Sequence, residues 1–274
     1  MKGDMNRKIA FIGAGNMAEA MVKGLVASGI VPKRDITVSD ASPNRLLHMK
    51  KYYEVGAAED NLNAAKGRDV IILAVKPKDA ESVLSEISGA CTSKQIVISI
   101  AAGVSVAKIE KALGRKARVI RVMPNTPALV QEGAAAVFAG PNARPGDMEI
   151  AAELLSGICK TVVTVADEKL MDAVTGLSGS GPAYVFVMLE ALSDAGVRMG
   201  LSREHSFALA AQTLAGAAVM AMQTKEPLSK LKDMVTSPGG TTIAGLQALE
   251  EKGLRAALYA AVEAATKRSQ ELGK

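Results

Sequence analysis

The stretch Lys8-Ile9-Ala10-Phe11-Ile12-Gly13-Ala14-Gly15-Asn16-Met17-Ala18 decides the fold of this chain. Its first five residues form the apolar run of a buried strand, and a helical pattern of apolar residues follows. The turn between them fits G-x-G-x-x-A in the strand, turn and helix context that this motif requires. We therefore predict a Rossmann-type unit, in which Gly13 permits the tight turn, Gly15 admits a pyrophosphate and Ala18 packs against the strand.

Further strands are predicted after this unit, at residues 36–39, 70–75, 96–100, 119–122, 134–138 and 161–165. Most are separated by helical patterns, and the strands are continuously apolar, which is typical of a parallel sheet covered on both faces. The fold class is therefore α/β, with an N-terminal Rossmann-type doubly wound parallel sheet.

Strand patterns stop after residue 168, and the rest of the chain is alanine-rich and helical. Helices are predicted at 169–177, at 182–199 with proline in the first turn, at 202–223 with a serine cap, and after Thr241 and Gly253. We therefore predict two domains: a dinucleotide-binding Rossmann domain, 1–167, and an all-helical dimerisation and substrate domain, 168–274. Because such helices bury little area, we expect a homodimer, with a compact monomer as the alternative.

Composition indicates a cytoplasmic enzyme. The chain has 274 residues, of which 49% are hydrophobic, and two cysteines, Cys91 and Cys159, that lack C-x-x-C spacing. This argues against a disulfide framework, a zinc or other metal site and a secreted protein. The N-terminus is polar, without a signal-peptide pattern, and the apolar stretch 207–222 is rich in alanine and glycine, which favours close helix packing over a membrane span.

The net charge of +5 is scattered along the chain, and aromatic residues make up only 3%. Stacking platforms for nucleic acid are therefore missing, so we expect no nucleic-acid partner. A positive field suits an anionic cofactor and an anionic substrate, although a generic solvated surface explains the same charge equally well.

A second candidate anion site lies at Ser237-Pro238-Gly239-Gly240-Thr241-Thr242, directly before a helical pattern. Glycines let successive backbone N–H groups converge, and a helix start adds unpaired donors and a positive dipole end. A carboxylate or phosphate can be held there without a lysine. The alternative is a plain loop before an N-capped helix.

Three other loops follow predicted strands: Val75-Lys76-Pro77, residues 99–103 and residues 123–127. Dinucleotides lie across the carboxyl ends of such strands, so all three loops are placed where a cofactor would pass. Each loop taken alone is equally compatible with an ordinary connector.

The chain offers no obvious general acid. His48 and His205 lie in no motif, and both are interpreted as solvated surface residues, while Lys76 is expected near the cofactor phosphates. A reduction that needs no protein acid fits an imine, whose nitrogen already carries its proton as an iminium ion. Positioning the nicotinamide and the substrate can then supply most of the catalysis.

Several motifs together resemble one family over essentially the whole chain. They are the glycine loop 11–18, the Val75-Lys76-Pro77 loop, and the blocks 121–127, 176–184 and 231–242. The resemblance is to pyrroline-5-carboxylate reductase. It implies reduction of the imino acid 1-pyrroline-5-carboxylate to L-proline by NAD(P)H, the final step of proline synthesis. It also implies a homodimer or a decamer of dimers, with the active site shared between the Rossmann domain of one subunit and helices of its partner.

The resemblance also implies roles for individual residues. It places Ala14, Asn16 and Met17 on the pyrophosphate, Asp40 and Asn61 near the adenosine ribose, Val75, Lys76 and Pro77 along the cofactor, and Ala102 beside the nicotinamide. The substrate carboxylate would lie on the amides around Gly240, Thr241 and Thr242, with Ser237 in the same loop. The Thr242 hydroxyl, our candidate catalytic group, would reach the ring nitrogen or carboxylate, and Glu168 would approach the substrate from the domain junction.

Asp40 departs from the family pattern. An acid at this position pairs with the ribose 2′-hydroxyl of NAD and repels the 2′-phosphate of NADP, whereas many relatives carry a small hydroxyl residue and use NADPH. A phosphate could still be held, if Asp40 turns away, by Ser39, Ser42, Asn44 and Arg45. On balance the sequence slightly favours NADPH over NADH.

Two rival functions fit less well. A β-hydroxyacid dehydrogenase also joins a Rossmann domain to a helical domain, but the positions of its characteristic lysine and asparagine hold Val185 and Leu189 here. A non-enzymatic cofactor-binding protein has no positive feature in the sequence, and two ligand sites argue against it.

Overall fold

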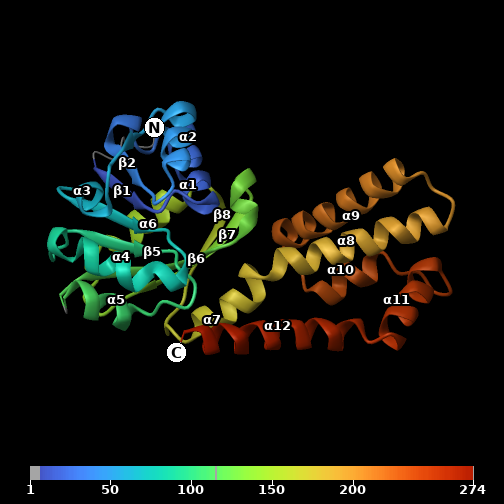
Figure 1. Cartoon of the computed structure of the whole chain (residues 1–274). Helices are drawn as coiled ribbons and strands as arrows, with labels where there is room; N and C mark the ends of the chain where they lie inside the picture. The colour runs from blue at the N-terminus through green and yellow to red at the C-terminus, as the bar shows by residue number, and fades with distance from the viewer. Residues whose placement is uncertain (1–6, 115, 274) are drawn as a thin grey trace. The chain divides into compact units, whose positions relative to one another are not determined.

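The computed structural model describes residues 7–114 and 116–273, and the chain divides into two compact units (Figure 1). Unit 1 comprises the described residues up to Ser180 together with those from Ala264 onward, and unit 2 comprises Gly181–Glu263. These two units are defined by packing alone, whereas the predicted domains, 1–167 and 168–274, are defined by cofactor and substrate binding. The division at residues 167 and 168 therefore stays a prediction.

Unit 1 is built on one eight-stranded sheet flanked by helices. The strands are β1 (Ile9–Ile12), β2 (Ile36–Ser39), β3 (Gly56–Ala57), β4 (Val70–Leu73), β5 (Ile96–Ser99), β6 (Arg118–Pro124), β7 (Gly133–Ala139) and β8 (Cys159–Thr164). The α-helices are α1 (Asn16–Ser28), α2 (Pro43–Tyr53), α3 (Asn61–Ala65), α4 (Ala80–Ile87), α5 (Val106–Leu113), α6 (Asp147–Leu155) and α7 (Leu170–Val174). Short 3-10 helices are Lys33–Asp35, Pro77–Asp79, Ser88–Ala90 and Thr126–Val130.

The strand order is β3-β2-β1-β4-β5-β6-β7-β8, and the first six strands are parallel. Alternate residues of each strand point to opposite faces, so both faces acquire a core. Phe11 packs with α1, α2 and α6 on one face, whereas Ile12 packs with α3, α4 and α5 on the other. Figure 1 shows these helices on the two sides of the sheet. The predicted doubly wound class is confirmed.

The last two strands run opposite to the others, which the sequence did not indicate. β7 is antiparallel to β6, and β8 is parallel to β7. Only residues 125–132 join β6 to β7, too short a connection for the crossover that parallel strands need. The longer connection from β7 to β8 carries α6, which allows those two strands to be parallel.

Unit 2 is helical. Its elements are α8 (Gly181–Arg198), α9 (Arg203–Thr224), α10 (Leu228–Met234), α11 (Thr241–Glu251) and the first turns of α12 (Leu254–Leu272), whose end belongs to unit 1. The predicted serine cap of α9 is confirmed, because Ser202 Oγ accepts from the N–H of His205 at 3.1 Å.

Two helical features differ from the sequence prediction. The helix expected over 169–177 ends at Val174, and a π-helical turn, Thr175–Gly179, follows it. Three glycines in the chain 176–181 weaken the preference for a regular helix there. α10 was not predicted, since it is only seven residues long and begins directly after Pro227.

The two units differ sharply in burial. Among the described residues, no apolar side chain beyond Met171 is buried, and the buried residues of α8, α9 and α12 are serines. Phe186, Phe207 and Met222 are 55–64% exposed. By length and composition alone α9 could also span a membrane, and most of its apolar stretch is exposed in the single chain. A single copy of unit 2 therefore has no hydrophobic core of its own.

Candidate active site

The glycine loop has the geometry that a bound dinucleotide requires. Gly13 has φ of 98°, and a Cβ there would lie 2.6 Å from the carbonyl oxygen of Ala74, so both the turn and the close approach demand glycine. A Cβ on Gly15 would meet no atom within 4 Å, which leaves open space in front of this residue. No side chain of the described residues caps the N-terminus of α1. Its first N–H groups can therefore serve an anion such as pyrophosphate, for which Asn16 and Met17 lie in the first turn.

Asp40 follows β2, and Asn61 begins the helix after β3, the parallel neighbour of β2. Asp40 Oδ2 accepts from the N–H of Ala14 at 2.7 Å, and Oδ1 accepts from the N–H of Ser42 at 2.8 Å. Asn61 Oδ1 accepts from Ser39 Oγ at 2.8 Å. The N–H of Ala14 thus already has a partner, and the amides of α1 are the better candidates for a pyrophosphate. Contacts of both side chains with a ribose stay predictions.

The Val75-Lys76-Pro77 loop follows β4 beside the glycine loop. Val75 is partly buried and its Cγ1 lies 3.1 Å from the Cβ position of Gly13, while Lys76 is exposed. Pro77 lines the rim of a cavity of about 440 Å³ between α4 and α5. Val75 and Lys76 do not line that cavity, whereas Pro77 and Gly103, the residue after Ala102, do.

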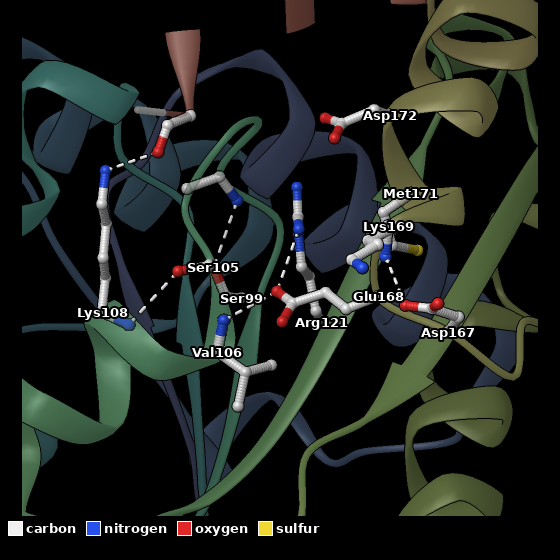
Figure 2. A network of polar contacts seen from close by, with 12 residues as sticks. Ser99, Ser105, Val106, Lys108, Arg121, Asp167, Glu168, Lys169, Met171 and Asp172 are labelled. Atoms are coloured by element: carbon white, nitrogen blue, oxygen red, sulfur yellow. Dashed lines mark hydrogen bonds and ion pairs between the residues drawn. The ribbon is translucent and has the colours of Figure 1, made fainter. Parts of the chain in front are cut away.

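Ala102 follows β5, and the loop that holds it contacts the end of the chain. Ala102 is half-buried, and the next residue, Gly103, has φ of 72°. A Cβ on Gly103 would lie 3.6 Å from backbone atoms of Leu272 and Gly273. Lys108 Nζ donates to the carbonyl oxygen of Gly273 at 2.6 Å (Figure 2). The last turn of α12 therefore supports the loop predicted to lie beside the nicotinamide, a contact that the sequence did not reveal.

Glu168 has structural partners within unit 1. Its Oε1 accepts from the backbone N–H of Val106 at 2.8 Å and from Nη1 of Arg121 at 3.0 Å (Figure 2). The Arg121 side chain is 8% exposed, so Glu168 neutralises a buried cation and also caps the N-terminus of α5. A substrate contact of Glu168 stays a prediction, and it would have to share a carboxylate that already holds two donors.

The predicted substrate loop forms an open helix N-terminus in unit 2. Gly239 has φ of 67°, and the N–H of Gly240 donates to the carbonyl oxygen of Ser237 at 3.0 Å. A Cβ on Gly240 would lie 2.3 Å from Ser237 Oγ, so a larger residue there would require the Ser237 hydroxyl to move. α11 begins at Thr241 without a side-chain cap from the described residues, and Thr242 is half-buried. This arrangement presents N–H donors to an anion.

His48 lies partly exposed at the surface, with a partner that the sequence did not indicate. His48 Nε2 lies 2.7 Å from Glu19 Oε1, and its side chain is 35% exposed. The sequence concealed this partner because the two residues are 29 positions apart. His205 is exposed in the first turn of α9. Glu19 and Tyr53 belong to no motif, and the contacts of Arg45 and His48 with Glu19 were not predicted.

Comparison with known proteins identifies the family. A relative from Methanosarcina acetivorans, named pyrroline-5-carboxylate reductase, is 48% identical over 269 residues, covering 98% of this chain and 99% of the relative. The chain belongs to the pyrroline-5-carboxylate reductase family. A relative of the same name from Escherichia coli is 42% identical over 98% of this chain and all of the relative.

Family models and solved structures agree with this membership. The pyrroline-5-carboxylate reductase dimerisation model matches residues 168–272, and a model described as NADP oxidoreductase coenzyme F420-dependent matches residues 8–103. The reductase from Coxiella burnetii has a TM-score of 0.92 at 38% identity, covering 98% of this chain and 99% of that one. The Plasmodium falciparum pyrroline carboxylate reductase with NADP bound has a TM-score of 0.89 at 35% identity, with coverage of 99% and 100%. The reductase fold and a self-associating helical region therefore apply to this chain.

Proposed function

We infer that this chain reduces 1-pyrroline-5-carboxylate to L-proline with a nicotinamide dinucleotide, the last step of proline biosynthesis. Relatives of that name match it over nearly its whole length. The structural observation that supports the substrate most directly is the open N-terminus of α11 after Gly239 and Gly240, since the substrate is a carboxylate and this turn offers backbone donors. An uncharged imine would gain nothing from those donors.

The residues of the glycine loop fit a dinucleotide. Gly13 and Gly15 provide a tight turn and open space, and the uncapped start of α1 provides donors for the pyrophosphate. In this proposal Asn16 and Met17 hold the pyrophosphate, Asp40 and Asn61 hold the ribose, and the loops at Val75 to Pro77 and at Ala102 line the path to the nicotinamide, which supplies a hydride when bound. Both NADH and NADPH are candidates.

The proposed reaction does not require an acidic side chain to donate a proton. Hydride addition to the carbon of a protonated imine converts C=N to C–N and leaves the ring nitrogen as an amine that keeps its proton. The protein must therefore hold the ring in position and neutralise the carboxylate. We assign the amides of Gly240, Thr241 and Thr242 to the carboxylate, with Ser237 shaping the turn. The Thr242 hydroxyl is assigned to the ring nitrogen or the carboxylate.

Self-association is part of the proposed function. The family dimerisation model covers unit 2, whose apolar side chains are exposed in the single chain. We propose a homodimer or a larger assembly of dimers, in which a second copy covers the exposed faces of α8 and α9. Because a second copy would cover the apolar faces of α8 and α9, these faces need no membrane. We therefore propose a cytoplasmic protein that binds neither a membrane nor a nucleic acid.

A steady-state assay tests the activity. Purified full-length protein is mixed with 1-pyrroline-5-carboxylate and NADH or NADPH, and oxidation of the dinucleotide is followed together with the formation of L-proline. We expect one proline for each dinucleotide oxidised. Saturable binding of dinucleotide without proline formation would contradict the proposed activity and would support a cofactor-binding protein instead.

A further inference from the structure

Ala14 in the glycine loop is held at both of its backbone polar groups by the next βα unit. Its N–H donates to Asp40 Oδ2 at 2.7 Å, and its carbonyl oxygen accepts from Arg45 Nε at 2.8 Å. A carboxylate and a guanidinium therefore flank one residue of the loop that we assign to the dinucleotide. Arg45 is thus the cation placed beside Asp40, where the 2′ position of an adenosine ribose is expected.

Glu19 holds Arg45 in this position. Arg45 Nη2 donates to Glu19 Oε2 at 2.6 Å, and the two side chains are 30% and 22% exposed. The other carboxylate oxygen, Oε1, accepts from Tyr53 OH at 2.8 Å and lies 2.7 Å from His48 Nε2. Glu19 comes from the first turn of α1, whereas its three partners all come from α2. The Glu19 carboxylate therefore holds the Arg45 guanidinium beside the glycine loop by a hydrogen-bonded ion pair.

The Glu19 carboxylate is ionised at neutral pH. Burial alone would raise the pKa of Glu19, but hydrogen bonds from Arg45, His48 and Tyr53 and the charge of Arg45 lower it to about 2. Burial and the same carboxylate raise the pKa of Tyr53 to about 12, so this hydroxyl remains a donor. Arg45 thus keeps an anionic partner throughout the pH range in which the protein would work.

Two other groups that could bind a 2′-phosphate are engaged as well. Ser39 Oγ donates to Asn61 at 2.8 Å, and the N–H of Ser42 donates to Asp40. Asp40 is held by two backbone N–H groups, so its charge cannot turn away without breaking both bonds. A 2′-phosphate would therefore meet the fixed charge of Asp40 and would have to compete with Glu19 for Arg45. A ribose hydroxyl is a donor, which the remaining lone pairs of Asp40 can accept.

We propose that Glu19 is a specificity-determining residue that directs this chain toward NADH, because it keeps the Arg45 guanidinium from a 2′-phosphate. The proposal reverses the slight preference for NADPH that the sequence alone indicates. It rests on the proposed function only in assigning the dinucleotide to the glycine loop. Neither Glu19 nor its pairing with Arg45 belongs to the glycine motif.

Binding measurements without turnover test the proposal. Isothermal titration calorimetry gives dissociation constants of the full chain for NADH and NADPH, and for the fragments ADP-ribose and 2′-phospho-ADP-ribose. We expect the unmodified protein to bind NADH and ADP-ribose more tightly than their phosphorylated counterparts. Glu19→Gln should shift the ratio of the two dissociation constants toward the phosphorylated ligand by about fivefold, since a partly exposed ion pair is removed.

Two of three further variants separate this effect from a change in net charge. Glu54→Gln is the matched control, because Glu54 pairs with Lys33 at 2.6 Å in an exposed ion pair, and its removal should leave the ratio unchanged. In the double variant Glu19→Gln with Arg45→Met the gain should disappear, since the guanidinium is gone. Asp40→Ser should also raise the preference for NADPH, because it removes the charge beside the 2′-phosphate.

Several results would overturn the proposal. One is equal or tighter binding of 2′-phospho-ADP-ribose by the unmodified protein, a measurement that stands even where Glu19→Gln fails to fold. Another is an unchanged ratio in a folded Glu19→Gln protein, judged by its thermal unfolding. Failure of all four ligands to bind would overturn the glycine-loop assignment along with this proposal. Selective binding without proline formation would contradict the reductase activity alone.

Discussion

Unit 1 and unit 2 use apolar side chains in opposite ways. In unit 1, Phe11, Met21 and Ile72 are fully buried between the sheet and its helices, whereas Phe186 and Phe207 of unit 2 are 63% and 55% exposed. Unit 1 thus contains its own core, and unit 2 presents apolar faces without one. Because the family dimerisation model covers unit 2, the contrast indicates that the cofactor unit is folded by internal packing and the helical unit by association.

The largest effect is expected from a core substitution in unit 1. Phe11→Ala removes a fully buried ring from β1 and should lower the free energy of unfolding by about 3–5 kcal/mol. Because the lost contacts lie within one chain, denaturant titrations at two protein concentrations should show the same loss. A loss confined to low protein concentration would mean that unit 1 also depends on association.

A substitution in unit 2 should act on association instead. Phe207→Asp places a charge on the exposed apolar face of α9 and should weaken self-association by about 2–4 kcal/mol. Sedimentation velocity over a range of concentrations measures this change. Gln223→Asp introduces the same charge at an already polar, exposed position of α9 and serves as the control. Unaltered association of Phe207→Asp would mean that another face of unit 2 is covered.

Glu168 tests whether a polar link inside unit 1 is structural. Glu168→Ala leaves the buried Arg121 guanidinium without its carboxylate and removes the acceptor for the N–H of Val106. We expect a loss of about 2–3 kcal/mol in the free energy of unfolding, less than for a fully buried pair because Glu168 is 25% exposed. Glu168→Gln keeps a neutral acceptor and should lose less. Unchanged stability with weaker substrate binding would instead support the substrate role implied by the family resemblance.

Thr242 tests the substrate site of unit 2. Thr242→Ala removes a hydroxyl from the first turn of α11 and should lower kcat/KM by about 1–3 kcal/mol in transition-state free energy. The dissociation constant of the dinucleotide and the thermal unfolding should not change. Thr242→Ser keeps the hydroxyl and should retain most of the activity. A matching loss of dinucleotide affinity would contradict the assignment to substrate.

The sequence predicted the parts of the fold that local patterns determine. The apolar run before Gly13 and the spacing of the glycines fix β1, the turn and α1, and the Gly239-Gly240 pair fixes the start of α11. Both features depend on a few consecutive residues. The reversed direction of β7 depends on the length of one connection, which the strand pattern itself does not encode.

Side-chain partners far apart in the sequence could not be predicted in this way. Glu168 pairs with Arg121 across 47 positions, and Asp40 accepts from Ala14 across 26. Motifs identify residues that a ligand would touch, but they do not show which of those residues already have partners. The Glu19 carboxylate contacts three side chains of α2. No sequence motif indicated these contacts, since Glu19 is recognisable only as an acidic residue in the first turn of α1.

Inhibition by L-proline and by its carboxamide tests whether the N-terminus of α11 binds the substrate carboxylate. The amide keeps the ring but lacks the charge that the backbone donors and the helix dipole would stabilise. We predict that the inhibition constant of L-proline against 1-pyrroline-5-carboxylate is lower than that of prolinamide by about tenfold, a difference of about 1.4 kcal/mol. Equal inhibition constants for the acid and the amide would contradict the carboxylate site.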